Sequence, residues 1–129
     1  HHVKFVGARG DVADFFHAAD LLIHPARTEN TGTVLLEAML CGLTVIATRN
    51  CGYAFHVERA NGGIVLPHPF SHSALRDAIV TAADPHRRIE WSSGGRRYCD
   101  ETDLYSMIDK AAELIVDRAR RNRQRQRTQ

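Results

Sequence analysis

Cysteine is scarce in this sequence of 129 residues, which contains only Cys41, Cys51 and Cys99. The number is odd and the three positions are far apart, so they predict neither a disulfide framework nor a cysteine-based zinc cluster. The eight histidines are scattered without the spacing of metal ligands. We therefore expect no metal site, and a reducing cytoplasm is the simplest location for the protein.

Long hydrophobic runs are also missing. No apolar stretch approaches the roughly 18 residues that a membrane span needs, and the first residues lack the apolar core of a secretion signal. The sequence does not begin with Met, so we expect it to be a piece of a longer protein. Its 43% hydrophobic and 25% charged residues are typical of a globular chain, and the length fits one domain.

The charge is spread unevenly along the chain. Six arginines and no acidic residue follow Asp117, and subtracting these six charges from the formal net charge of +2 leaves −4 on residues 1–117. An acidic body without a basic stripe argues against nucleic-acid binding. We predict one domain over residues 1–120, incomplete at its N-terminus, and a flexible basic tail over residues 121–129. The alternative role of this tail is attraction to an anionic membrane surface.

Short apolar runs alternate with helix-like segments along the chain. The pattern predicts strands over residues 3–6, 20–24, 44–48 and 63–66, and helices over residues 11–19, 31–40, 53–60, about 71–83, 87–98 and 103–120. This alternation is typical of a parallel α/β sheet with right-handed crossovers. The fold class that we expect is a Rossmann-like parallel sheet with flanking helices, whose first strands are cut away.

The loop that follows the second predicted strand is the expected ligand site. Ligands of open α/β sheets bind beyond the carboxyl ends of the strands, against helix N-termini. This loop runs from His24 to Thr33, and small polar residues and a glycine lead directly into a strongly predicted helix. The free backbone N–H groups at such a helix start suit a phosphate. His24, at the end of the strand, fits a hydrogen-bonded structural residue better than a ligand-binding one.

Two acidic residues flank this helix start. Glu29 precedes the helix, and Glu37 lies inside it on the same face as Thr33. A carboxylate repels a phosphate but pairs well with the two hydroxyls of a sugar diol, so amides and two acids together suit a nucleotide sugar. The alternative is a solvated loop acid and an acid that favours the helix dipole, with Asn30 and Thr31 as simple N-caps.

The segment HPARTENTGTVLLEAMLCGLTVIAT resembles the donor-binding signature of retaining GT-B glycosyltransferases of family four, whose Glu-x7-Glu motif matches Glu29 and Glu37. CGYAFHVE (Cys51 to Glu58), LPHPFS and DLYS more narrowly resemble the lipopolysaccharide core glucosyltransferase I group. The resemblance covers about residues 3–116. It implies an N-terminally truncated C-terminal domain of a GT-B enzyme, the domain that binds the sugar donor.

The resemblance also implies the activity and the roles of individual residues. The activity is transfer of glucose from UDP-glucose to an inner-core heptose of lipopolysaccharide, with retention at the anomeric carbon and without a metal or other cofactor. By this resemblance, Glu29 is the catalytic residue and holds the hydroxyls of the donor sugar, and Glu37 binds the ribose. Sugar and phosphate are bound by the backbone amides of Asn30, Thr31, Gly32, Thr33 and Val34. The uracil is contacted by Val6 and Gly7, at the end of the first predicted strand.

Parts of the family pattern fall outside this sequence. The family's basic residues that neutralise the diphosphate and its acceptor-binding domain lie upstream, so we expect this chain to be inactive by itself. Arg9 and Arg27 are the cations near the predicted site. A complete enzyme of this kind is expected on the cytoplasmic face of the inner membrane, as a peripheral protein. The alternatives are a family-four enzyme with another donor or acceptor, and an inactive fragment that binds nucleotide sugars.

Overall fold

Three parallel strands form the centre of the structure. This computed structural model describes residues 2–104 and 106–127, and at residues 107, 108, 119 and 121–127 it describes the backbone alone. The strands are β1 (Leu21–His24), β2 (Thr44–Thr48) and β3 (Gly63–Leu66), and their order in the sheet is β1-β2-β3. Leu21 lies opposite Thr44, and Val45 lies opposite Gly63. All five residues of β2 are buried, as expected for a central strand that is covered on both faces.

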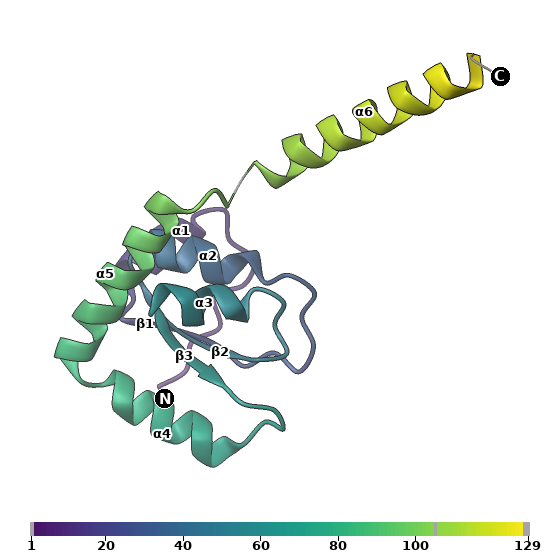
Figure 1. Ribbon diagram of the computed structural model, residues 1–129. Helices are drawn as coiled ribbons and strands as arrows, with labels where there is room; N and C mark the ends of the chain where they lie inside the picture. Colours follow the sequence, from purple (N-terminus) through teal and green to yellow (C-terminus); the bar gives the residue numbers. More distant parts are fainter. Residues whose placement is uncertain (1, 105, 128–129) are drawn as a thin grey trace.

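Helices cover both faces of this sheet (Figure 1). The helices are α1 (Val12–Ala18), α2 (Thr33–Leu40), α3 (Ala54–Ala60), α4 (His72–Ala82), α5 (Pro85–Glu101) and α6 (Met107–Arg127). Successive side chains of a strand point to opposite faces. Accordingly, Val45 and Ala47 belong to one core with residues of α2 and α3, and Ile46 belongs to a second core with residues of α4. The predicted parallel sheet with flanking helices is confirmed.

Local sequence explains where α4 and α5 begin. Ser71 caps α4, because its Oγ accepts a hydrogen bond from the Ala74 N–H at 3.3 Å. Asp84 caps α5 by accepting from the His86 N–H at 2.9 Å, and Pro85 takes the first helical position, where its missing N–H is not needed. The helix predicted over residues 87–98 therefore begins earlier, at Pro85.

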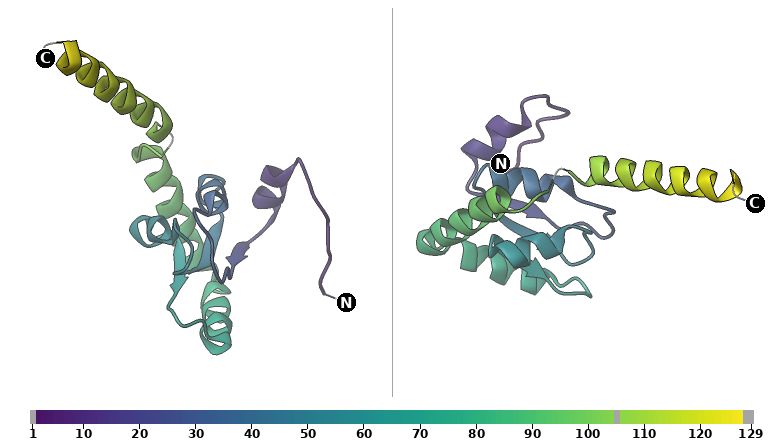
Figure 2. Two further views of the ribbon diagram at one scale, coloured as in Figure 1. Left: turned by 90° about the vertical axis from the view of Figure 1, so that its right-hand side faces the viewer. Right: turned by 45° about the horizontal axis from the view of Figure 1, so that its top comes forward.

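The N-terminal segment corrects one sequence prediction. Residues 3–6 form no strand, and the side chains of Val3 and Phe5 are 76% and 95% exposed. An apolar β-branched pattern favours a strand only where a neighbouring strand supplies hydrogen bonds. The segment runs outside the body before α1 (Figure 2), so this neighbour is missing and the prediction of a strand is wrong.

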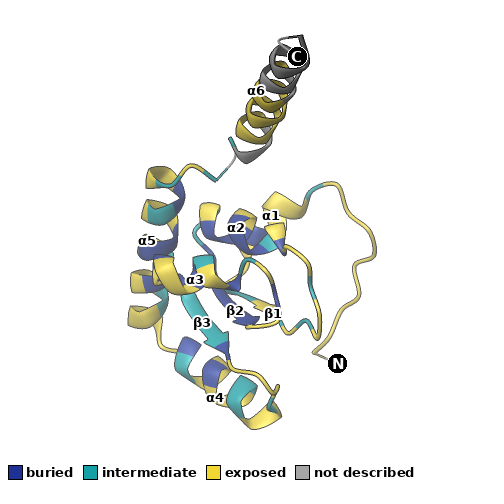
Figure 3. Cartoon of the chain, turned by 45° about the vertical axis from the view of Figure 1, so that its right-hand side comes forward, coloured by how far each residue is buried: buried dark blue, intermediate teal, exposed yellow. Residues whose placement is uncertain are grey.

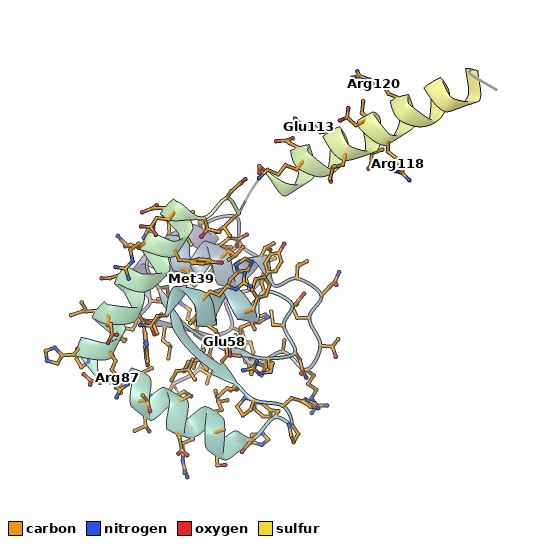
Figure 4. All side chains as sticks on the ribbon, in the orientation of Figure 1. Met39, Glu58, Arg87, Glu113, Arg118 and Arg120 are labelled. Carbon is orange, nitrogen blue, oxygen red and sulfur yellow. The ribbon has the colours of Figure 1, made fainter. Side chains whose placement is uncertain are left out.

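The C-terminal helix α6 extends away from the body (Figure 1). In Figure 3, the described residues of α6 are coloured as exposed, whereas α2 and α5 contain buried residues. The labelled side chains of Glu113, Arg118 and Arg120 point outward from it (Figure 4). The backbone is helical through Arg127, where the sequence predicts a flexible tail from residue 121. The flexibility of this segment stays a prediction.

Candidate functional site

Residues 25–32 join β1 to α2 at the carboxyl edge of the sheet, where the sequence places the ligand. The main chain of Glu29 is held on both sides in this loop. Its N–H donates to the Asn50 carbonyl at 3.3 Å, and its carbonyl accepts from the Gly52 N–H at 3.2 Å. The Glu29 side chain remains 37% exposed. The backbone of this acid is therefore fixed, while its carboxylate is accessible at the surface.

Gly32 forms the N-cap of α2 with a left-handed backbone, φ 76° and ψ 49°. A Cβ at this position would lie 2.2 Å from the Cys51 Sγ, so only glycine fits both the conformation and the space. No side chain caps the helix. The alternative that Asn30 and Thr31 serve as N-caps is therefore wrong, and among the side chains that the structure describes, no oxygen caps the first N–H groups of α2.

Thr33 and Glu37 lie on the exposed side of α2, as their spacing predicts. The buried side consists of Leu35, Leu36, Ala38 and Met39. Val34 is half-buried between the two sides. Within the described part of the chain, the Glu37 carboxylate makes no hydrogen bond or ion pair. Glu29 and Glu37 thus lie before and after the start of one helix, and both can reach a ligand from solvent.

His24, the last residue of β1, lies next to Glu29. Its Nε2 is 4.0 Å from the Glu29 Oε2, which is beyond hydrogen-bond distance. This Nε2 is shielded from solvent and has no hydrogen-bond partner among the described residues. For this atom, the interpretation of His24 as a hydrogen-bonded structural residue is wrong, and a polar group of a ligand would satisfy it.

The remaining predicted residues divide between the N-terminal segment and the loop before α2. Val6 and Gly7 belong to the exposed N-terminal segment, and no described hydrogen bond connects them to the loop before α2. Arg9 donates to the Asp11 carboxylate at 2.8 and 2.6 Å, so its charge faces that acid. Arg27 is exposed in the loop, two residues before Glu29. The structure therefore brings residues 29–37 together but leaves the predicted uracil contacts outside.

Sequence reasoning missed the contribution of the loop after β2. Thr48 Oγ1 donates to the Ala26 carbonyl at 2.6 Å, and Asn50 Nδ2 donates to the Arg27 carbonyl at 2.8 Å. The available signal is topological, because the loops that follow two neighbouring parallel strands meet at one edge of the sheet. The two loops form one hydrogen-bonded unit around Glu29.

Cys51 belongs to this unit as a structural thiol. It is buried, and its Sγ donates to the Thr31 carbonyl at 3.5 Å. Burial raises the pKa of the Cys51 thiol, and the negative charge of Glu29 adds to this effect. A thiol with a raised pKa is a poor nucleophile at neutral pH, so Cys51 supports the loop and does not supply covalent chemistry.

A cavity of about 420 Å³ lies between α3, the end of α5 and the beginning of α6. Tyr53, His56 and Tyr98 line it, and the His56 Nδ1 is 2.7 Å from the Tyr98 Oη. Burial lowers the pKa of His56, and the nearby charge of Arg59 lowers it further. The cavity is therefore a largely apolar pocket beside a neutral imidazole. It adjoins the loop unit through Tyr53, whose N–H donates to the Thr31 carbonyl at 2.7 Å.

Two general features of the described residues bear on the chemistry. In residues 2–104 and 106–127, no three His, Cys, Asp or Glu side chains are grouped as metal ligands would be. None of the helices in these ranges is both long enough and apolar enough to cross a bilayer. Amides, carboxylates and an imidazole at one helix start are therefore the groups that this site offers to a ligand.

Known proteins resemble this chain in sequence and in fold. The family described as "Glycosyl transferases group 1" matches residues 1–97. The lipopolysaccharide glucosyltransferase WaaG of Escherichia coli is 44% identical over 116 residues, which cover 89% of this chain and 31% of WaaG. A crystal structure of WaaG superposes with a TM-score of 0.83 over 88% of this chain and 31% of that chain. A D-inositol 3-phosphate glycosyltransferase of Streptomyces bingchenggensis is 30% identical over 83% of this chain and 23% of its own length.

The chain thus spans less than a third of the length of these relatives. The family match covers most of the chain, and it contains the complete loop unit around Glu29 and the helix that carries Glu37. The structural match to WaaG agrees with the parallel sheet and its flanking helices, and it identifies the GT-B fold. On this evidence, the chain belongs to the glycosyl transferases of group 1.

Proposed function

We propose that this chain is the donor-binding part of a retaining glycosyltransferase that transfers glucose from UDP-glucose to an inner-core heptose of lipopolysaccharide. One observation carries the proposal. Glu29 and Glu37 flank the start of α2, where the N-cap residue is Gly32 and no N-cap side chain covers the first backbone N–H groups. The likeness to WaaG supports glucose as the sugar and lipopolysaccharide as the acceptor.

In this proposal, Glu29 holds the hydroxyls of the glucose, and Glu37 holds the ribose. A carboxylate accepts two hydrogen bonds from a vicinal diol and gains strength from its charge. The amides of Asn30, Thr31, Gly32, Thr33 and Val34 bind the sugar and the diphosphate. Preorganised N–H donors stabilise the negative charge that develops on the leaving UDP, and this is the main catalytic contribution of the chain.

The experiment that tests this assignment compares UDP-glucose with UDP in calorimetric titrations. We expect Glu37→Ala to weaken the binding of both ligands, because both contain the ribose. Glu29→Ala should weaken UDP-glucose alone. A hydrogen bond to a charged group contributes about 1.5–3 kcal/mol, so each loss predicts a roughly tenfold or larger increase in Kd. Glu113→Ala on α6, whose exposed side chain points outward from the helix (Figure 4), is the matched control.

Unchanged affinities in both variants would contradict the proposal. Tighter binding of UDP-galactose than of UDP-glucose would replace the sugar and leave the donor site in place, whereas tighter binding of GDP-mannose would also replace the nucleotide. The proposal also holds that no metal takes part, so an excess of EDTA should leave the Kd for UDP-glucose unchanged. A loss of binding that Mg²⁺ restores would contradict this part.

The acceptor site, in this proposal, belongs to a part of the enzyme outside this chain. The chain spans 31% of WaaG, and we therefore expect it to bind UDP-glucose without transferring the sugar. An acceptor linked to lipid would place the enzyme peripherally on the cytoplasmic face of the inner membrane. The arginines after Asp117 are the residues that would attract anionic lipid. Co-sedimentation with phosphatidylglycerol vesicles, in low and high salt, tests this attraction.

A further inference from the structure

The end of β2 and the loop that follows it make several hydrogen bonds to the loop that carries Glu29. Three side chains donate to carbonyls of that loop: Thr48 to Ala26 at 2.6 Å, Asn50 to Arg27 at 2.8 Å and Cys51 to Thr31 at 3.5 Å. The main-chain bonds of Asn50 and Gly52 to Glu29 lie between these contacts. Glu29 is therefore bracketed on both sides by anchored carbonyls.

We propose that Thr48 and Asn50 are positioning residues that set the direction of the Glu29 carboxylate and thereby the selectivity for a sugar on the nucleotide. This inference rests on the proposed function and adds two residues to it. Thr48 and Asn50 anchor the half of the loop that precedes Glu29. The half that follows is held separately by the Cys51 thiol, by the Tyr53 N–H and by α2 itself.

This division of the loop predicts which ligand contacts depend on the two anchors. Loss of a donor at Thr48 or Asn50 leaves the Ala26 or Arg27 carbonyl without its partner, so the segment up to Glu29 can shift. The amides of residues 30–34 and the exposed carboxylate of Glu37 keep their own supports. The affinity for the sugar should therefore fall, whereas the affinity for the UDP part should be retained.

Thr44 provides a matched control for Thr48. Both threonines lie on β2, both are at least 96% buried, and both donate a side-chain hydrogen bond to a main-chain carbonyl. Thr44 Oγ1 donates to Arg88 in α5 at 3.4 Å, at the opposite end of the strand from the Glu29 loop. Thr44→Val and Thr48→Val each remove one hydroxyl from β2, but only Thr48→Val removes a hydrogen bond to the loop that carries Glu29.

The experiment measures the Kd of UDP-glucose and of UDP for the wild-type chain, Thr48→Val, Asn50→Asp and Thr44→Val. A hydrogen bond of average strength corresponds to about a fivefold change in an equilibrium constant. We expect Thr48→Val and Asn50→Asp to weaken UDP-glucose about fivefold and to change UDP by less than about twofold. Thr44→Val should change neither. Asn50 is exposed, so its isosteric change to Asp tests the idea even if Thr48→Val fails to fold.

The possible outcomes separate this inference from the proposed function. If the wild-type chain binds UDP-glucose more tightly than UDP and both anchor variants keep this preference, the positioning role is wrong and the donor site stands. If Thr44→Val loses the preference to the same extent as Thr48→Val, a general loosening of the strand explains the effect and the inference fails. If the wild-type chain binds neither ligand, the proposed function fails and the inference fails with it.

Discussion

Helices α2 and α6 both carry apolar residues at helical spacing, but their environments are opposite. Four of the eight residues of α2 are buried, between the sheet and α5. In α6, every side chain that the structure describes is exposed, including Leu114 at 72% and Ile115 at 69%. Apolar spacing therefore predicts that a helix forms but not that its apolar side is covered. The candidate site is at the start of the covered helix, where packing fixes the position of each backbone amide.

The strongest test of this comparison is the same truncation in each helix. Leu35 in α2 is fully buried, so Leu35→Ala should lower the free energy of unfolding by about 2–5 kcal/mol through lost contacts and a residual cavity. Leu114→Ala in α6 should change it by less than about 0.5 kcal/mol. Urea unfolding, followed by the fluorescence of the buried Trp91, measures both. Similar effects in the two variants would show that α6 is packed against the body in solution.

A second test compares two glycines, one in the site and one in the exposed N-terminal segment. A Cβ on Gly52 would lie 1.9 Å from the Asn30 carbonyl oxygen, so Gly52→Ala must separate the two loops around Glu29. Such overpacking costs about 1–3 kcal/mol, and we expect UDP-glucose affinity to fall by roughly tenfold or more. Gly10→Ala is the control, because nothing lies within 4 Å of its Cβ position. An unimpaired Gly52→Ala would show that the loop unit is not rigid.

Most of the body could be predicted from the sequence. The run Thr44–Thr48 is continuous and β-branched, which is typical of a strand covered on both faces, and β2 has these bounds. The same pattern reasoning failed for residues 3–6, because a strand also requires a hydrogen-bonded neighbour, and sequence composition contains no information on whether one is present. The course of α6 was unpredictable for a related reason. Its direction depends on contacts that local spacing does not encode.

The residues of the candidate site were likewise predicted only in part. The acids at 29 and 37 and the helix start between them were predicted from local spacing, and the structure places them on one loop and one helix. Thr48 and Asn50 were not predicted, because their role comes from side chains that reach across from a neighbouring strand. The pairing of β1 with β2 indicates that the two loops meet, but only the folded chain shows which atoms bind.

The next prediction concerns pH and the covered part of the molecule. Burial, with a contribution from Arg59, lowers the pKa of His56 below its ordinary value of about 6.5. The unfolded chain then binds a proton more readily than the folded chain. The contribution of His56 to stability is therefore complete above about pH 6.5 and is lost as the pH falls through the lowered pKa.

Nuclear magnetic resonance (NMR) titration of the imidazole should give a midpoint below 6.5, and His56→Gln should reduce the loss of stability between pH 7 and pH 5. A midpoint at or above 6.5 would contradict the burial of this ring.

The smallest expected effect concerns Asp103, at the junction with α6. The ammonium group of Lys110 holds the pKa of this carboxyl well below its usual range, and hydrogen bonds from the Ser106 hydroxyl and N–H add to the effect. The folded chain therefore keeps Asp103 ionised at pH values where an unfolded chain would protonate it. Its contribution is complete above the ordinary Asp value of about 3.9 and declines as the pH falls below it.

Because Asp103 is exposed and α6 extends away from the body, this titration should affect the start of the helix and leave the unfolding of the body nearly unchanged. NMR of the Asp103 carboxyl carbon should give a midpoint below 3.9, and Lys110→Ala should raise it, since Lys110 is the largest cause of the shift. The urea midpoint of the body, which should respond to Leu35→Ala, should remain the same in Lys110→Ala. A parallel drop in that midpoint would mean that α6 and the body unfold as one unit. The two helices would then differ in the exposure of their side chains but not in whether they unfold with the body.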